Sequence, residues 1–342
     1  MSVRRVLLFL VSIALAALLI VLLIRIGKVD LRLMLHQLES VSAVNFIKLF
    51  LLHGLLVFLS TAKWRCVDAA LRRPADFIPS WVASFFVSSA GMALGLILPV
   101  QLGMTMARTI GTHTYGRALK RGTAGTLFEQ GFDFMIVVFL TVASAVTWLC
   151  GGDGVMWTIS AVVMIAIALL ATEPSIRIAL WLLRCVSRIA LHGSSSESHH
   201  WLRKFVAHAL RRFSALQHSG LVNARLVRRL VIISAARFAV VVLFANQTSE
   251  ATGAHILLWR MAAATPFAVL ANVIGVTPGG IGVNELTSVT ALHLFGTPLD
   301  IASQWALMNR ILGTGACFAV AASAFLILGL QKLIAPSAHG AH

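Results

Sequence analysis

Ionisable side chains interrupt several apolar stretches of this chain, among them Arg108, Glu129, Asp133, Glu285 and Arg310. A charged group at membrane depth is costly unless it is paired or faces a polar cavity, and it is a functional hypothesis by default. A guanidinium matches phosphate oxygens in a bidentate geometry, whereas a carboxylate holds a cationic group or carries a proton. The side-chain types therefore indicate a site that binds a charged group inside an apolar protein.

A run of helix-breaking residues separates an apolar stretch of helix length, 257–276, from a shorter and more polar stretch at 284–295 that is expected to be helical again. Glycine and proline do not continue a helix comfortably. Irregular backbone at membrane depth is tolerated only where protein buries it or where it lines a cavity, and transporters place substrates at such breaks. The candidate site residues here are Pro278, Gly279, Gly280 and Gly282, with Glu285 directly behind them.

A second break follows the stretch 80–98, which is apolar but rich in serine and glycine. Pro99 ends this stretch, Gly103 follows four residues later, and Arg108 lies beyond. Further cations come soon after, and cytoplasmic loops carry an excess of Lys and Arg. We therefore expect a re-entrant hairpin that enters the membrane and returns to the cytoplasm.

The composition is that of an integral membrane protein. Hydrophobic residues make up 58% of the 342 residues and charged residues 12%, and the formal net charge is +16. That positive charge favours contact with anionic lipid headgroups and orientation in the membrane. No nucleic-acid-binding motif occurs, and the four cysteines lack metal-site spacing. We therefore expect no nucleic-acid partner, no metal and no cofactor.

The order of apolar stretches predicts an all-α, polytopic fold with about 7–9 membrane segments. Basic residues before the first span favour a cytoplasmic N-terminus. Lys63 opens a group of cations expected at the cytoplasmic end of the second span, whereas 175–191 either crosses the membrane or lies on its surface. The expected spans are 6–24, 49–62, 122–149, 155–171, 230–245, 257–276 and 301–330, with a polar connection at 25–48.

An internal repeat relates the two breaks within one membrane domain, residues 1–342. Pro99 and Pro278 are 179 residues apart, and each precedes a glycine by four residues. We define 80–149 and 255–332 as the two repeat cores, and 192–229 as a basic cytoplasmic loop between them. With a re-entrant hairpin at the first break, an odd number of spans separates the breaks, which predicts an inverted repeat.

Four motifs resemble the membrane domain of the lysylphosphatidylglycerol synthase family, over nearly the whole chain. They are Leu98-Pro99 with Gly103 and Arg108; Glu129 with Asp133; Pro278-Gly279-Gly280-Ile281-Gly282 with Glu285; and Asn309-Arg310. That domain also occurs alone in bacterial proteins. No soluble aminoacyl-transferase domain follows the last span here, so the resemblance implies lipid handling and not aminoacylation.

The resemblance implies a lipid flippase of the bacterial inner membrane that moves a phospholipid or another polar-headgroup lipid between leaflets. Its expected partners are membrane lipids, in particular anionic ones. Two alternatives stay open: a membrane-embedded lipid-modifying transferase, and a non-transporting partner of lipid-biosynthesis proteins. The lipid, the energy source and the oligomeric state do not follow from the sequence.

Charge pairing gives a further expectation. Glu129 and Asp133 are four residues apart and share one helical face, so at least one of them should meet a buried Arg108, Arg237 or Arg310. Glu129 with Arg310, or Glu285 with Arg237, would be packing pairs. We also expect Arg108 and Glu285 to matter for lipid movement more than for folding.

Overall fold

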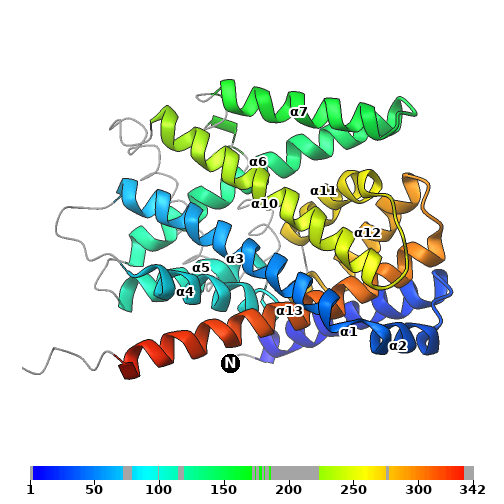
Figure 1. The fold of residues 1–342 in the computed structure, drawn as a ribbon, viewed down its shortest axis with the longest axis horizontal. Coiled ribbons are helices and arrows are strands. Elements are labelled where there is room, and N and C mark those ends of the chain that lie inside the picture. Colours follow the sequence, from blue (N-terminus) through cyan, green and yellow to red (C-terminus); the bar gives the residue numbers. More distant parts are fainter. Residues whose placement is uncertain are drawn as a thin grey trace, which may run out of the picture.

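A computed structural model describes residues 3–71, 79–98, 100–114, 119–171, 223–274 and 277–334, with a few single positions between 174 and 185. The described residues form helices and no strands (Figure 1). The elements are α1 (Val3–Ile26), α2 (Leu31–Ser40), α3 (Ala43–Leu71), α4 (Trp81–Leu94), α5 (Val100–Thr114), α6 (Leu119–Leu149), α7 (Gly154–Leu170), α10 (Ala224–Ala251), α11 (Leu258–Ile274), the 3-10 turn η1 (Pro278–Gly280), α12 (Val283–Leu294) and α13 (Leu299–Ile334).

Three helices of the described part are long and apolar enough to cross a membrane, within α3, α6 and α13. The bent pair α1 and α2, which meet at 96°, would make a fourth span. The all-helical membrane class is thereby confirmed, whereas the count of 7–9 segments stays a prediction. Residue Pro99, most of the segment 175–191 and most of the loop 192–229 lie outside the described residues.

The expected polar connection at 25–48 contains a short helix, and its last residues belong to the second span. Asp30 accepts hydrogen bonds from the backbone N–H groups of Arg32 at 2.9 Å and Leu33 at 3.2 Å. This N-cap satisfies amide groups that a helix start leaves unpaired, so α2 begins there and turns the chain into α3. The second span starts at Ala43 and not at Leu49.

The first break is a helical hairpin: α4 ends at Leu94 and α5 begins at Val100. Gly103 of α5 lies against α4, because a Cβ there would meet the backbone N of Gly95 at 2.5 Å. Close approach of two helices needs such small residues. The second break, α11–η1–α12, confirms the predicted sequence of helix, break and helix.

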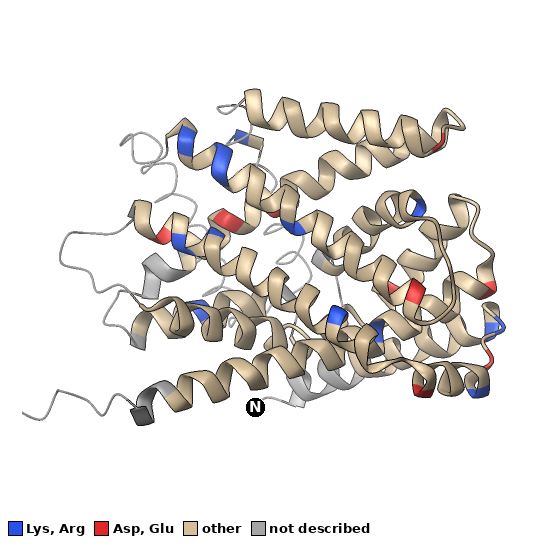
Figure 2. Cartoon of the chain, viewed as in Figure 1, with Lys and Arg blue, Asp and Glu red and all other residues tan. Residues whose placement is uncertain are grey.

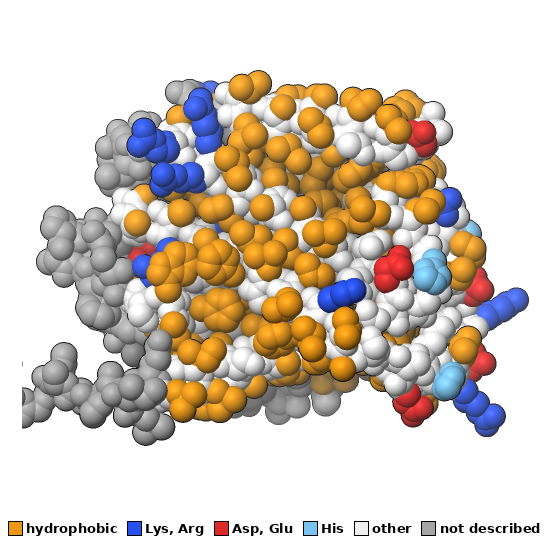
Figure 3. Space-filling model, in the orientation of Figure 1, with side chains coloured by type: hydrophobic (Ala, Val, Ile, Leu, Met, Phe, Trp, Pro, Cys, Tyr) orange, Lys and Arg blue, Asp and Glu red, His pale blue; other side chains and the backbone are white. Residues whose placement is uncertain are grey.

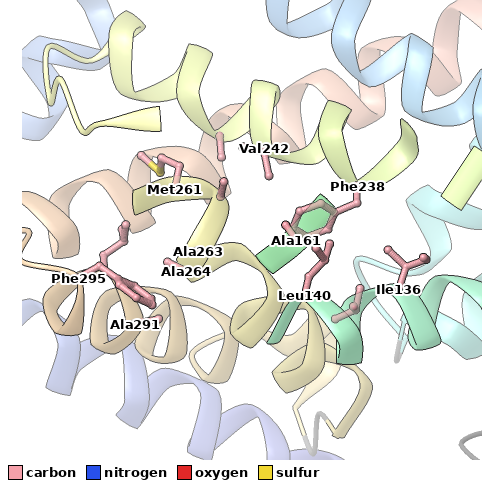
Figure 4. Packing of buried hydrophobic residues seen from close by; sticks show 14 of the residues in the cluster. Ile136, Leu140, Ala161, Phe238, Val242, Met261, Ala263, Ala264, Ala291 and Phe295 are labelled. Atoms are coloured by element: carbon pink, nitrogen blue, oxygen red, sulfur yellow. The ribbon is translucent and has the colours of Figure 1, made fainter. Parts of the chain in front are cut away.

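The central helix of the fold is α6, whose side chains Phe132, Met135 and Ile136 are fully buried. Figure 4 shows its residues Ile136 and Leu140 in one cluster with Ala161 of α7 and Phe238 of α10. Small and large side chains interdigitate in this cluster, and the dispersion contacts of such packing stabilise helix association in a membrane.

The outer surface is apolar over the middle of the molecule and charged towards its two ends. Figure 3 shows hydrophobic side chains covering the centre of the visible face, and many large apolar side chains are exposed, including Leu51, Ile159 and Phe325. Figure 2 places most charged residues towards the left and right ends of the view. This is the surface that a bilayer requires, with acyl chains around the middle and water at the ends.

Candidate functional site

The second break is formed by three glycines in left-handed backbone conformations. Gly279, Gly280 and Gly282 have φ angles of 59°, 69° and 84°, which other residues rarely adopt. Their surroundings also leave no room for side chains. A Cβ on Gly279 would collide with the carbonyl of Leu96 at the first break, and a Cβ on Gly282 would lie 2.6 Å from Leu19 Cβ in α1. Gly279 therefore allows the two breaks to touch each other, and Gly282 allows α1 to approach the second break.

Glu285 and Arg310 hold this break in place. The Glu285 carboxylate accepts a hydrogen bond from the Gly282 N–H at 2.6 Å, and its other oxygen lies 3.1 Å from Arg310 Nε. Arg310 in turn donates through Nη2 to the Gly279 carbonyl at 2.7 Å. A charge-assisted bond at each end makes this a clamp from α13 to the break, and it differs from the expected pairing of Glu285 with Arg237.

A cavity of about 260 Å³ lies where the two breaks meet. Gly95 and Leu96 line it from the first break, and Gly279 and Glu285 line it from the second. One water needs on the order of 10–15 Å³ of such space, so the cavity is large enough for a group of many atoms. Its polar lining also includes Arg237 and Arg310 of α10 and α13, together with His53 of α3 and three asparagines described below.

A charge triad lies beside this cavity. Asp133 Oδ2 forms an ion pair with Lys63 Nζ at 2.5 Å and accepts a hydrogen bond from Arg237 Nη1 at 2.6 Å. Asp133 thereby links α6 to α3 and α10. Arg237 is the member that lines the cavity, and its Nε is buried without a hydrogen-bond partner. Lys63 is fully buried, so it is used inside the protein, and its place at the cytoplasmic end of the second span stays a prediction.

Arg108 and Glu129 form a separate ion pair in the interior. The Arg108 side chain is fully buried and also donates through Nη2 to the Ser60 carbonyl at 3.0 Å and to Ser60 Oγ at 2.9 Å. Its guanidinium lies 5.2 Å from the Trp64 ring centroid, within cation–π range. Neither Arg108 nor Glu129 lines the cavity, so in this conformation the pair joins α5 to α6 and α3.

The expectation that a carboxylate of α6 meets a buried cation is confirmed by Glu129 with Arg108, and Asp133 pairs with the partly buried Arg237. The expected pair Glu129–Arg310 does not form, because Arg310 is used at the second break. Pro278 opens η1, and Gly280 lies against Asn272, since a Cβ there would collide with its side-chain oxygen. Among the predicted site residues, Gly279, Glu285 and Arg310 line the cavity.

Several cavity residues were not predicted as site residues: Asn272, Asn284, Asn309, His53 and Arg237. Asn309 belongs to the motif that opens the last span, and Asn272 is a lone amide in an apolar helix. A buried amide in a membrane helix is a signal of the same kind as a buried charge, because it too needs partners. The described residues contain no group of three or more potential metal ligands.

The family known as the lysylphosphatidylglycerol synthase TM region matches residues 9–321. The chain belongs to this family. This family consists of the membrane-embedded region of lysylphosphatidylglycerol synthase-type proteins, which agrees with a lipid-related membrane function. No curated protein matches the chain.

Proposed function

We propose that this chain moves a lipid with a polar headgroup between the leaflets of the bacterial inner membrane. The observation that carries the proposal is the polar cavity at the meeting point of the two breaks, in a protein whose outer surface is apolar. Membership of the lysylphosphatidylglycerol synthase TM region family supports a lipid as the ligand. The breaks, the buried charges and the cavity then belong to one site.

The physical problem of lipid translocation is the headgroup. Moving a charged or hydrogen-bonding group into hydrocarbon without replacement partners costs many kcal/mol. The cavity offers such partners: the Arg237 guanidinium, the backbone of the second break and several amides. A cavity of about 260 Å³ accommodates a headgroup, whereas the acyl chains of the same lipid remain in the bilayer.

The arrangement of the two hairpins supports an inverted repeat. Figure 1 shows α4 and α5 in the left half of the molecule and α11 and α12 in the right half. Their breaks meet between them, where Gly279 lies against Leu96. In the proposed topology the two hairpins enter from opposite membrane faces and return, so that small movements of either hairpin open the cavity to one face at a time.

Gly313 permits a graded test of the cavity. It lines the cavity from α13, and a Cβ added there would make ordinary contacts of 3.6 and 3.8 Å with Phe244. Gly313→Ala should therefore be tolerated, whereas Gly313→Leu should place apolar bulk in the cavity. The matched control is Gly54→Leu in α3, because a Cβ at Gly54 would meet nothing within 4 Å.

The assay is transfer of fluorescently labelled phospholipid between the leaflets of proteoliposomes. We expect the parent and Gly54→Leu to move the lipid at the same rate, and Gly313→Leu to be at least tenfold slower, which corresponds to about 1.4 kcal/mol in the barrier. Folding is checked by gel filtration. If the parent protein moves no labelled lipid, the proposed function is refuted; if Gly313→Leu moves lipid at the parent rate, the cavity is not the path.

A further inference from the structure

Three asparagines from three different helices line the cavity. They are Asn272 of α11, Asn284 of α12 and Asn309 of α13, and together we call them the amide triad. The same three residues also line a second cavity of about 130 Å³. The amide triad therefore borders two adjacent cavities at the second break.

Part of the hydrogen-bonding capacity of the amide triad is unused within the described protein. The side-chain oxygens of Asn272 and Asn309 are buried and have no hydrogen-bond partner there. Asn284 Oδ1 lies 3.5 Å from Ser288 Oγ, but that hydroxyl already donates to the Asn284 carbonyl at 2.8 Å. Buried polar groups without partners are costly and rare in proteins, so these atoms indicate a hydrogen-bonding occupant.

The type of side chain defines the chemistry of that occupant. A carboxamide carries two N–H donors and one acceptor oxygen, and it is uncharged. A hydroxyl group also donates and accepts, so several amides from different directions suit several hydroxyls on one ligand. A phosphate diester, which only accepts at neutral pH, matches Arg237 in the lining of the larger cavity but not the unpaired amide oxygens.

The second cavity adds an apolar requirement. Besides the amide triad, its lining includes Val241, Met261, Ala264 and Ala268. A group bound in the second cavity thus meets both amides and aliphatic side chains. A polyol or sugar ring has this character, because its hydroxyls project from a skeleton of C–H groups.

We propose that the amide triad binds the hydroxyl groups of a polyol or sugar unit in the headgroup of the transported lipid, with Arg237 at its phosphate. This assignment rests on the proposed function, lipid translocation, and it specifies the class of headgroup. It predicts selection by hydroxyl count: a lipid with a bare phosphate lacks the groups that the amides bind, whereas glycerol and inositol headgroups supply them.

The experiment is equilibrium binding to the purified full-length protein in nanodiscs, with dilutions of phosphatidic acid, phosphatidylglycerol and phosphatidylinositol as probes. We expect the two hydroxylated lipids to bind roughly tenfold more tightly than phosphatidic acid, since each hydrogen bond contributes modestly. Asn272→Leu and Asn309→Leu should each bring that ratio close to one. Asn45→Leu is the matched control, because Asn45 pairs with Gln247 at 3.3 Å and does not line the cavity.

Glycerol phosphate and inositol phosphate serve as water-soluble probes of the same chemistry. If both soluble probes bind more weakly than the lipids, the result supports a lipid ligand. If they bind as tightly as the lipids, the amide triad binds hydroxyl groups but the ligand is not a lipid. Equal binding of all three lipids to the parent, or a selectivity that survives both asparagine variants, overturns the assignment. The transport assay separates failure of the headgroup assignment from failure of the proposed function. If the parent moves lipid without headgroup preference, lipid translocation stands and only the role of the amide triad is overturned.

Discussion

Replacing Arg108 by leucine should unfold this protein rather than weaken its hold on lipid. The Arg108 guanidinium is fully buried and neutralises Glu129, whose side chain is 1% exposed. Arg108→Leu leaves that carboxylate buried without its cation, which costs about 3–5 kcal/mol. A loss of this size lowers the ratio of folded to unfolded protein by roughly two to four orders of magnitude, and it reverses the sequence-based expectation that Arg108 acts mainly on lipid.

A double variant distinguishes a packing pair from a lipid-binding residue. Replacing both Arg108 and Glu129 by leucine removes the uncompensated charge, and apolar replacements of buried pairs are often close to neutral. We therefore expect the double variant to be more stable than either single variant. Such a rescue is the signature of two residues whose main partners are each other.

The measurement is thermal unfolding in detergent for the two single variants, the double variant and Arg25→Leu, which removes an exposed cation at the end of α1. The control should unfold at the temperature of the parent. The reasoning is refuted if Arg108→Leu is as stable as the parent but moves no lipid, because the guanidinium would then act on the ligand and not on Glu129.

Two further predictions concern the interior. Gly103→Ala should destabilise the protein markedly, because the new Cβ would lie 2.5 Å from the Gly95 backbone N. The control Gly54→Ala should be neutral or stabilising by up to about 1 kcal/mol, since its Cβ enters open space. Equal melting temperatures of the two variants would show that the α4–α5 contact is loose. Asp133→Asn should lower the melting temperature more than Lys63→Met, because the first leaves two cations facing each other and the second leaves Asp133 paired with Arg237; the opposite order would contradict the triad.

The helices and the breaks were predictable because each depends on local chemistry. Apolar runs of membrane length predict helices whatever their neighbours are, and the glycines after Pro278 exclude a regular helix on conformational grounds alone. The start of α2 was also encoded locally, in the N-cap Asp30, but the polar character of its surroundings concealed it. The helices and breaks named here thus followed from the sequence, whereas the helix α2 was not predicted.

The partners of the buried charges were not predictable, because they depend on which helices pack together. Glu129 faces Arg108 and Glu285 faces Arg310, whereas spacing along the chain allowed several other pairings. Lys63 was assigned to a membrane boundary by the positive-inside rule. Its burial is explained only by the ion pair with Asp133, which α6 brings next to α3. The asparagines of the cavity were missed for the same reason, since an uncharged amide shows its significance only when its neighbours are known.

The length of α13 has a consequence for the surrounding bilayer. Its apolar part, Leu299–Leu330, has 32 residues, which corresponds to about 48 Å at 1.5 Å per residue. The hydrocarbon core of a bilayer is only about 30 Å thick. The helix is therefore long enough to span the bilayer while tilted, and the mismatch between its length and the bilayer costs fractions of a kcal/mol per Å. Because α13 also carries Asn309 and Arg310, membrane thickness acts directly on the helix that forms one wall of the cavity.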